Sequence, residues 1–169
     1  MPKIAPCLWF DKQSEEAADF YVSVFSAAPR RDLASGGPNS KILEVVKASA
    51  DTPSGPKGSV LLVNFILDGQ EFTALNGGPY FKLNEAVSFV INCKDQAEID
   101  YYWEKLSAVP ESEQCGWLKD KFGLSWQVVP ENIGELVNSE SGMKAMLEMK
   151  KLDIKALEEA NELLEREQK

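Results

Sequence analysis

The first 75 residues contain short apolar runs around one amphipathic stretch. Apolar side chains recur at helical spacing after Ser14, which predicts a helix with Ser14 as its N-cap that runs to about Phe25. The pair Asp68-Gly69 separates two apolar runs and predicts a β-hairpin. The predicted order is therefore one strand, one helix and then antiparallel strands, with the strands at 4–10, 29–33, 42–48, 59–67 and 70–75.

The middle of the chain repeats this order of elements. A strand is predicted at 86–92, and Asp95 with Glu98 three residues later forms a capping-box pattern that predicts the start of a second helix. A second hairpin is predicted from the apolar runs at 115–119 and 124–129. Apolar groups beyond this hairpin predict three short helices, around 133–137, 143–150 and 154–164.

The two halves are predicted to be copies of one unit. Residues 9–25 match residues 90–106 at a shift of 81 positions, including an Asp-aromatic-Tyr triplet in each helix. The hairpins match at a shift of 54 positions, with Gly69 opposite Gly123. Internal repetition of this kind predicts two modules that share a core. The predicted boundaries are 1–75 for the first module, 76–130 for the second, and 131–169 for a C-terminal helical extension.

The composition narrows the classes of partner. A formal net charge of −9 disfavours binding to nucleic acid and to anionic membranes, because both require a basic surface. No apolar run is long enough to cross a bilayer, and the N-terminus lacks the pattern of a signal peptide. Three cysteines without paired spacing indicate reduced thiols, so we expect a cytoplasmic protein.

The sequence contains no histidine. Ser-His-Asp and Cys-His catalysis are therefore excluded, together with the usual zinc, nickel and non-haem iron sites. A metal site made only of carboxylates stays open. A general base would have to be a carboxylate, a thiol, a lysine or a tyrosine.

Six strings resemble the PhnB-like family, which is often labelled 3-demethylubiquinone-9 3-methyltransferase: PCLWFD at 6–11, ALNGGP at 74–79, NEAVSFV at 84–90, QCGWLKD at 114–120, FGLSWQVVP at 122–130 and MKKLDI at 149–154. The order of elements is similar to the vicinal oxygen chelate fold of glyoxalases, bleomycin-resistance proteins and extradiol dioxygenases. The resemblance implies an α+β fold of tandem βαβββ modules that form a curved mixed-sheet cleft. It also implies a homodimer.

In metal-dependent relatives of this superfamily, the first and last strands of each module supply four ligands. The resemblance places these positions near Pro6, Ala74, Val87 or Ser88, and Gln127. Only Gln127 is a useful ligand, and one neutral amide does not hold a divalent ion. We therefore expect neither a metal ion nor another cofactor.

Aromatic residues lie on or beside the strands in which metal-ligating residues are missing. Because successive strand residues face opposite sides, at most one of Trp9 and Phe10 faces the cleft, and Trp126 lies under the helices if Gln127 faces the cleft. A core role for the aromatic rings, a hinge role for residues 76–79 and an inert thiol at Cys115 are the structural alternatives. The candidate ligand contacts are Trp9, Asn76, Tyr80, Ser88, Cys115, Trp117 and Gln127.

These observations favour a metal-free protein that binds an apolar or aromatic small molecule in the cleft between the modules. The alternative is an enzyme, either a lyase, isomerase or dioxygenase-like member of the superfamily or the methyltransferase of the family label. The glycine-rich stretch at 36–38 precedes no helix, so it is not the loop that binds a methyl donor in methyltransferases.

Overall fold

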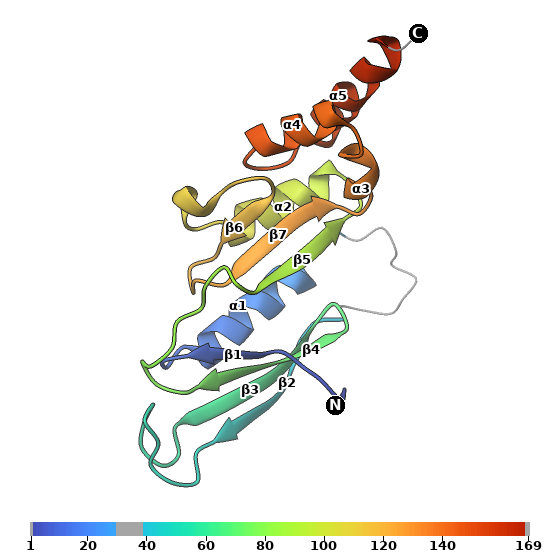
Figure 1. Cartoon of the computed structure of the whole chain (residues 1–169). Coiled ribbons are helices and arrows are strands. Elements are labelled where there is room, and N and C mark those ends of the chain that lie inside the picture. Colours follow the sequence, from blue (N-terminus) through green and yellow to red (C-terminus); the bar gives the residue numbers. More distant parts are fainter. Residues whose placement is uncertain (1, 30–38, 168–169) are drawn as a thin grey trace. The chain divides into compact units, whose positions relative to one another are not determined.

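The computed structural model describes residues 2–29 and 39–167, and the side chains of these residues up to Asn161. The chain divides into two compact units, Met1–Leu83 and Asn84–Lys169 (Figure 1). Among the described residues, no helix has the length and apolar character needed to cross a membrane. The α+β class and the mixed sheets expected from the sequence are confirmed.

Unit 1 is one complete βαβββ module. Its sheet has the strand order β1-β4-β3-β2, with β1 parallel to β4 and the other pairs antiparallel. Residues 30–33 of the predicted strand at 29–33 and the glycine-rich stretch at 36–38 lie outside the described residues. The elements are β1 (Cys7–Phe10), α1 (Ser14–Ser26), β2 (Lys41–Lys47), β3 (Val60–Leu67) and β4 (Gln70–Asn76).

The predicted hairpin between β3 and β4 is confirmed. Asp68 and Gly69 have φ angles of 43° and 88°, the left-handed backbone that a two-residue type I′ turn requires. Behind this hairpin, α1 packs on the sheet through stacked rings: the centroids of Tyr21 and Phe65 are 6.4 Å apart, and those of Phe65 and Phe72 are 5.4 Å apart.

The predicted N-cap of α1 is wrong. Gln13 occupies the N-cap position without a side-chain capping bond, and Ser14 is the first helical residue. The acceptor comes instead from the end of β4, where Asn76 Oδ1 accepts a hydrogen bond of 2.9 Å from the backbone N–H of Ser14. Asn76 Nδ2 also donates to the carbonyl oxygen of Val60. One side chain therefore joins β4, α1 and the start of β3.

Unit 2 has a shorter module with three strands. Its order is β5-β7-β6, with β5 parallel to β7 and β6 antiparallel to it. Only residues 107–116 separate α2 from β6, too short a stretch for a counterpart of β2 with its turns, and a single 3-10 turn lies there instead. The elements are β5 (Ser88–Cys93), α2 (Gln96–Leu106), the 3-10 turn η2 (Pro110–Ser112), β6 (Trp117–Lys119) and β7 (Ser125–Pro130).

The internal repeat is present in both helices and both hairpins. Tyr21 and Tyr102 are both buried at equivalent positions of α1 and α2, and Gly69 and Gly123 share a φ of 88°. The first strands of the two units, however, match at a shift of 83 residues, two more than the predicted shift of 81. Leu8 pairs with Ala74 while Ile91 pairs with Val128, so Leu8 corresponds to Ile91. A shift of two residues keeps each side chain on the same face of its sheet.

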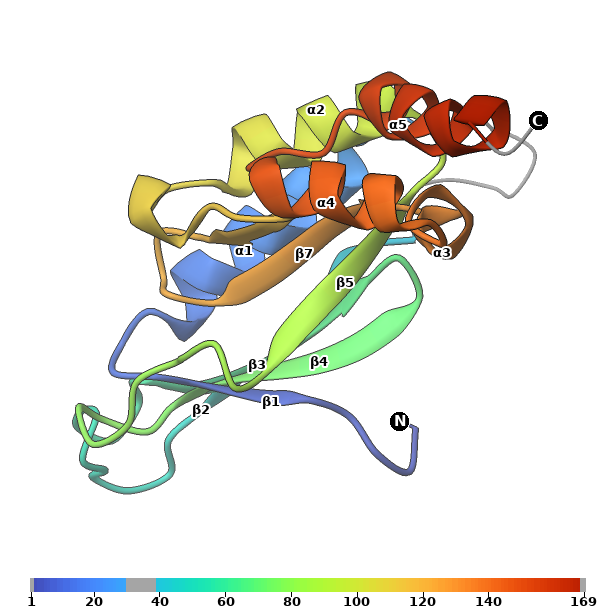
Figure 2. The ribbon, with the colours of Figure 1, turned by 45° about the horizontal axis from the view of Figure 1, so that its top comes forward.

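The C-terminal extension folds as part of unit 2. Its helices are α3 (Ile133–Leu136), α4 (Glu140–Glu148) and α5 (Ile154–Glu167), and Figure 2 shows α5 beside α2. A small core of Val129, Leu136, Leu152 and Leu157 joins the extension to the end of β7. The three helices predicted after the second hairpin are confirmed.

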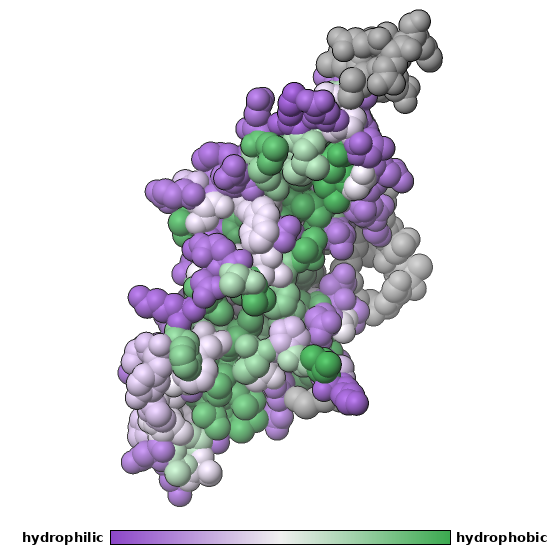
Figure 3. Space-filling view, viewed as in Figure 1, coloured by the Kyte–Doolittle hydropathy of each residue, from purple (hydrophilic) through white to green (hydrophobic). Residues whose placement is uncertain are grey.

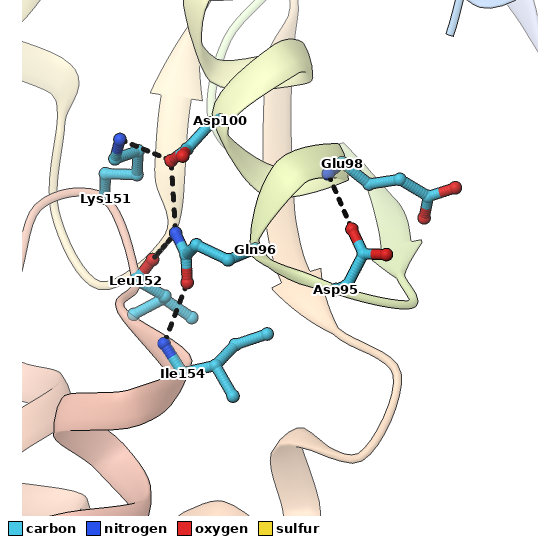
Figure 4. A network of polar contacts seen from close by, with 7 residues as sticks. All are labelled: Asp95, Gln96, Glu98, Asp100, Lys151, Leu152 and Ile154. Carbon is cyan, nitrogen blue, oxygen red and sulfur yellow. Dashed lines mark hydrogen bonds and ion pairs between the residues drawn. The ribbon is translucent and has the colours of Figure 1, made fainter. Parts of the chain in front are cut away.

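A polar network holds the start of α5 against the first turn of α2 (Figure 4). The amide of Gln96 donates to the carbonyl oxygen of Leu152 at 3.0 Å and accepts from the backbone N–H of Ile154 at 2.9 Å. Asp100 accepts from the same amide at 3.1 Å and pairs with Lys151 at 2.5 Å. At the start of α2, Asp95 is the N-cap as predicted and accepts from the backbone N–H of Glu98.

The turn between β6 and β7 is built on one buried carboxylate. Asp120 is 1% exposed, and its Oδ1 accepts from the backbone N–H groups of Phe122 and Leu124. Its Oδ2 accepts from the indole N–H of Trp126 at 2.8 Å. Trp126 is therefore fixed within the core of unit 2.

Replacing Asp120 with alanine is expected to destabilise the protein by about 2–4 kcal/mol, because three donors lose their acceptor in a buried site. Urea unfolding followed by circular dichroism measures the change. Asp153→Ala is the matched control, since Asp153 Oδ1 accepts from one exposed N–H, that of Ala156. Equal losses for the two variants would contradict the role assigned to Asp120.

Candidate ligand-binding faces

Each sheet has one face covered by its own helix. In unit 1, α1 covers the face that carries Leu8, Phe65, Phe72 and Ala74, all of which are buried. The opposite face, which we call the open face of unit 1, carries Cys7, Trp9, Glu44, Val46, Leu62, Asn64, Thr73 and Leu75.

A polar row crosses the open face of unit 1. Strand register places Cys7 beside Thr73, Thr73 beside Asn64, and Asn64 beside Glu44. Thr73 Oγ1 donates to Asn64 Oδ1 at 2.8 Å, and Asn64 Nδ2 donates to Glu44 Oε2 at 3.3 Å. These bonds orient the amide of Asn64 within the sheet.

An apolar row runs beside the polar one. Trp9 lies beside Leu75, Leu75 beside Leu62, and Leu62 beside Val46. Figure 3 shows apolar side chains gathered over the strands of unit 1. The open face therefore combines an apolar surface with oriented hydrogen-bonding groups, as small-molecule sites generally do.

Trp9 is held in one orientation. Its indole N–H donates to the carbonyl oxygen of Gly78 at 2.9 Å, and the ring of Phe81 meets it edge-on at 4.9 Å between centroids. A Cβ on Gly77 would lie 2.3 Å from the Trp9 ring, so this close approach requires glycine. Since Phe10 is buried in the core, only Trp9 of this pair faces the open side, as expected.

The other two candidates of unit 1 differ from Trp9. Asn76 is 7% exposed, and both ends of its amide are bonded to backbone groups of α1 and β3, so it is a structural residue. Ser54 also donates to its backbone oxygen at 2.7 Å. Tyr80 is 69% exposed in the segment after β4.

Unit 2 brings three of the candidates together. Gln127 lies between Trp117 on β6 and Val90 on β5 in the strand register. Its amide Nε2 donates to the hydroxyl of Ser88 at 2.9 Å. Trp126 lies on the face toward α2, as predicted for the case in which Gln127 faces the other side. The open face of unit 2 includes Ser88, Val90, Trp117, Lys119, Ser125 and Gln127.

Sequence reasoning missed the second row of this face. Ser125 lies between Ser88 and Lys119, and Lys119 forms an ion pair with Glu85. The Ser125 hydroxyl is buried and has no hydrogen-bond partner among the described residues, an arrangement that costs about 1–3 kcal/mol. Alternation could have found Ser125 and Lys119, because each lies two residues from a candidate on the same strand.

Cys115 does not belong to this face. Its backbone is left-handed with a φ of 52°, its N–H donates to the carbonyl oxygen of Met149, and its thiol points to the carbonyl oxygen of Leu147 at 3.7 Å. It therefore anchors the loop before β6 to the extension. Of the other thiols, Cys93 lies in the core, where burial and the nearby charges of Glu98 and Asp95 raise its pKa to about 12.

The positions expected for metal ligands need one correction. Ala74 is fully buried toward α1. The neighbouring residue Thr73, which pairs with Cys7 in the strand register, lies on the open face instead. Among the described residues, no three cysteine, aspartate or glutamate side chains come close enough to hold a metal ion.

Comparison with known proteins identifies the family. The family described as 3-demethylubiquinone-9 3-methyltransferase matches residues 2–129. The chain belongs to this family. A structure described as a putative 3-demethylubiquinone-9 3-methyltransferase, PhnB protein, from Bacillus cereus is 31% identical, with coverage of 75% of this chain and 98% of that one and a TM-score of 0.56. The resemblance to the PhnB-like family predicted from the sequence is thereby confirmed.

A second structure supports the fold alone. Protein PA1353 from Pseudomonas aeruginosa is 18% identical, with coverage of 77% of this chain and 98% of that one, and has a TM-score of 0.53. No protein with a curated description matches the chain. The family match ends at residue 129, so the helical extension lies beyond the matched residues.

Replacing Gly77 with alanine is expected to displace the Trp9 ring, break its bond to Gly78, and destabilise the protein by about 1–3 kcal/mol through overpacking. The Trp9 indole signal in a nitrogen–proton NMR spectrum, assigned with Trp9→Phe, should shift. Gly134→Ala is the control, because a Cβ on Gly134 meets no atom within 4 Å. An unchanged Trp9 signal in Gly77→Ala would show that the ring is not held as described.

Proposed function

We propose that this PhnB-like protein binds a planar, apolar or aromatic small molecule on the open faces of its sheets without a metal ion. One observation carries the proposal: each open face joins a tryptophan with an oriented amide and a hydroxyl. In unit 1 these groups are Trp9, Asn64 and Thr73, and in unit 2 they are Trp117, Gln127 and Ser88. Of these groups, Trp9, Ser88, Trp117 and Gln127 are candidates from the sequence.

The chemistry of these groups suits binding. A tryptophan ring gives a large contact area with little loss of conformational entropy, and a fixed amide orients a ligand through one or two hydrogen bonds. The chain has no histidine to act as a general base at neutral pH, which favours binding over proton-transfer catalysis. We place the protein in the cytoplasm, in keeping with its three free thiols.

Replacing Trp117 with alanine should weaken binding of 2-naphthamide, a neutral planar probe, by about 5- to 30-fold, because the ring contact is worth about 1–2 kcal/mol. Isothermal titration calorimetry measures the change. Phe122→Ala removes an aromatic ring from the turn of the same unit and should leave the affinity unchanged.

Two results would overturn this proposal. Binding that is lost with a chelator and restored by a transition metal would show a metal site. Binding of S-adenosylmethionine in place of the probe would favour the methyltransferase of the family label.

We also propose that the protein forms a homodimer through its C-terminal helices. On α4, Met143 and Leu147 have 40% and 54% of their surface exposed, and Figure 3 shows apolar side chains gathered there. Burial of exposed apolar side chains is the main driving force of most association between proteins.

Sedimentation at micromolar concentration is expected to give about twice the monomer mass of 18.8 kDa. Leu147→Glu should shift the protein toward the monomer, because a buried charge without a partner opposes association. Lys155→Gln on α5, at a side chain that is 84% exposed, is the control. A wild-type species of 18.8 kDa alone would contradict the dimer.

A further inference from the structure

One cation lies at the edge of the open face of unit 2. Lys119 ends β6, and its ammonium group donates to the carboxylate of Glu85 in the segment before β5. The Lys119 side chain is 21% exposed and that of Glu85 is 58% exposed. The lysine of this ion pair is thus mostly buried, whereas the glutamate is exposed to solvent.

Several hydrogen-bond donors on this face are available to a ligand. The side-chain amide of Gln127 donates to the hydroxyl oxygen of Ser88, so the hydroxyl proton of Ser88 is still available as a donor. Ser125, the next residue in the row, has a hydroxyl that no described group engages. Lys119 has three N–H bonds, and Glu85 is the one hydrogen-bond acceptor found for them among the described residues. Together these groups suit an oxygen anion, for which charged donors give the strongest hydrogen bonds.

Glu85 already supplies such an anion. The hydrogen bond from Lys119, a backbone hydrogen bond and the charge of Lys119 all lower the pKa of Glu85, which keeps its carboxylate ionised at neutral pH. An ion pair at the surface contributes little to stability when water can solvate one of its charges, as it can solvate Glu85 here. Exchange of this carboxylate for that of a ligand would conserve the contact of Lys119 and add a partner for Ser125.

We propose that the open face of unit 2 selects planar ligands that carry a carboxylate or a similar oxyanion, which Lys119 and Ser125 bind in exchange for Glu85. The ring of the ligand lies against Trp117, two residues before Lys119 on the same face of β6. The inference rests on the proposed function and adds the charge of the ligand to it.

The test compares two probes of the same shape, 2-naphthoate and neutral 2-naphthamide, by isothermal titration calorimetry. The wild-type protein should bind the carboxylate at least 5-fold more tightly than the amide. Glu85→Gln, which removes the competing anion, should tighten binding of naphthoate by about 3- to 10-fold and leave naphthamide unchanged. Glu140→Gln breaks an exposed ion pair with Lys144 on α4 and serves as the control.

Two further variants separate the anion site from the ring contact. Lys119→Gln should abolish the preference for naphthoate while naphthamide still binds. Ser125→Ala should weaken naphthoate by about 3- to 10-fold, and this variant removes a buried hydroxyl without a partner, so the fold should tolerate it. Circular dichroism verifies that each variant is folded.

Equal affinities for the two probes, with no effect of Glu85→Gln, would overturn the exchange of anions and leave the proposed function standing. Failure of both probes to bind would overturn the proposed function and this inference together. A preference for naphthoate that survives Lys119→Gln would place the anion elsewhere and likewise contradict the inference.

Discussion

Coverage of one sheet face by a single helix is the constraint on which the candidate site depends. In a strand, alternate side chains face opposite sides, so burial of Phe72 and Ala74 toward α1 places Thr73 and Leu75 on the other side. In unit 2, Trp126 and Val128 are buried toward α2 and Gln127 on the opposite face is only partly covered, although Ser125 on that face is buried as well. The hydrophobic core that stabilises each unit thus determines which residues reach the open face.

Two polar anchors make this alternation rigid. Asn76 ties the end of β4 to the first turn of α1, and Asp120 ties the turn before β7 to Trp126. Both side chains are buried with their hydrogen bonds made, so their loss would leave donors unpaired away from water. The open faces are consequently built on strands whose register is fixed by buried groups, which is the condition for holding a ligand in one orientation.

The sequence predicted the elements well and the details of register less well. Helical periodicity and the Asp68-Gly69 turn depend on neighbouring residues, and the structure confirms them. The N-cap of α1 could not be found in this way, because Asn76 supplies the acceptor from the far end of the unit. The register of β5 against β7 is likewise a tertiary pairing, and a two-residue shift leaves the apolar pattern unchanged.

In the candidate site, too, single residues could be predicted from the sequence and their tertiary neighbours could not. Ser88, Trp117 and Gln127 were predicted singly, and the pairing of strands brings them together. Lys119 and Ser125 were missed because a lysine and a serine in a strand carry no distinctive motif. Their significance depends on the tertiary structure: Lys119 pairs with the carboxylate of Glu85, and the buried hydroxyl of Ser125 has no hydrogen-bond partner among the described residues.

The C-terminal extension supports the edge of the sheet in unit 2. In unit 1 the outer strand β2 pairs along β3, whereas in unit 2 the segment before β6 is too short to form such a strand. The backbone N–H groups of Cys115 and Gly116 instead donate to the carbonyl oxygens of Met149 and Lys150, and the carbonyl oxygen of Gly116 accepts from the backbone N–H of Val128. Because Gln96 and Asp100 of α2 hold the following turn, the extension supports the strand that carries Trp117 and Lys119. The three-stranded sheet of unit 2 thereby has a defined edge at its candidate site.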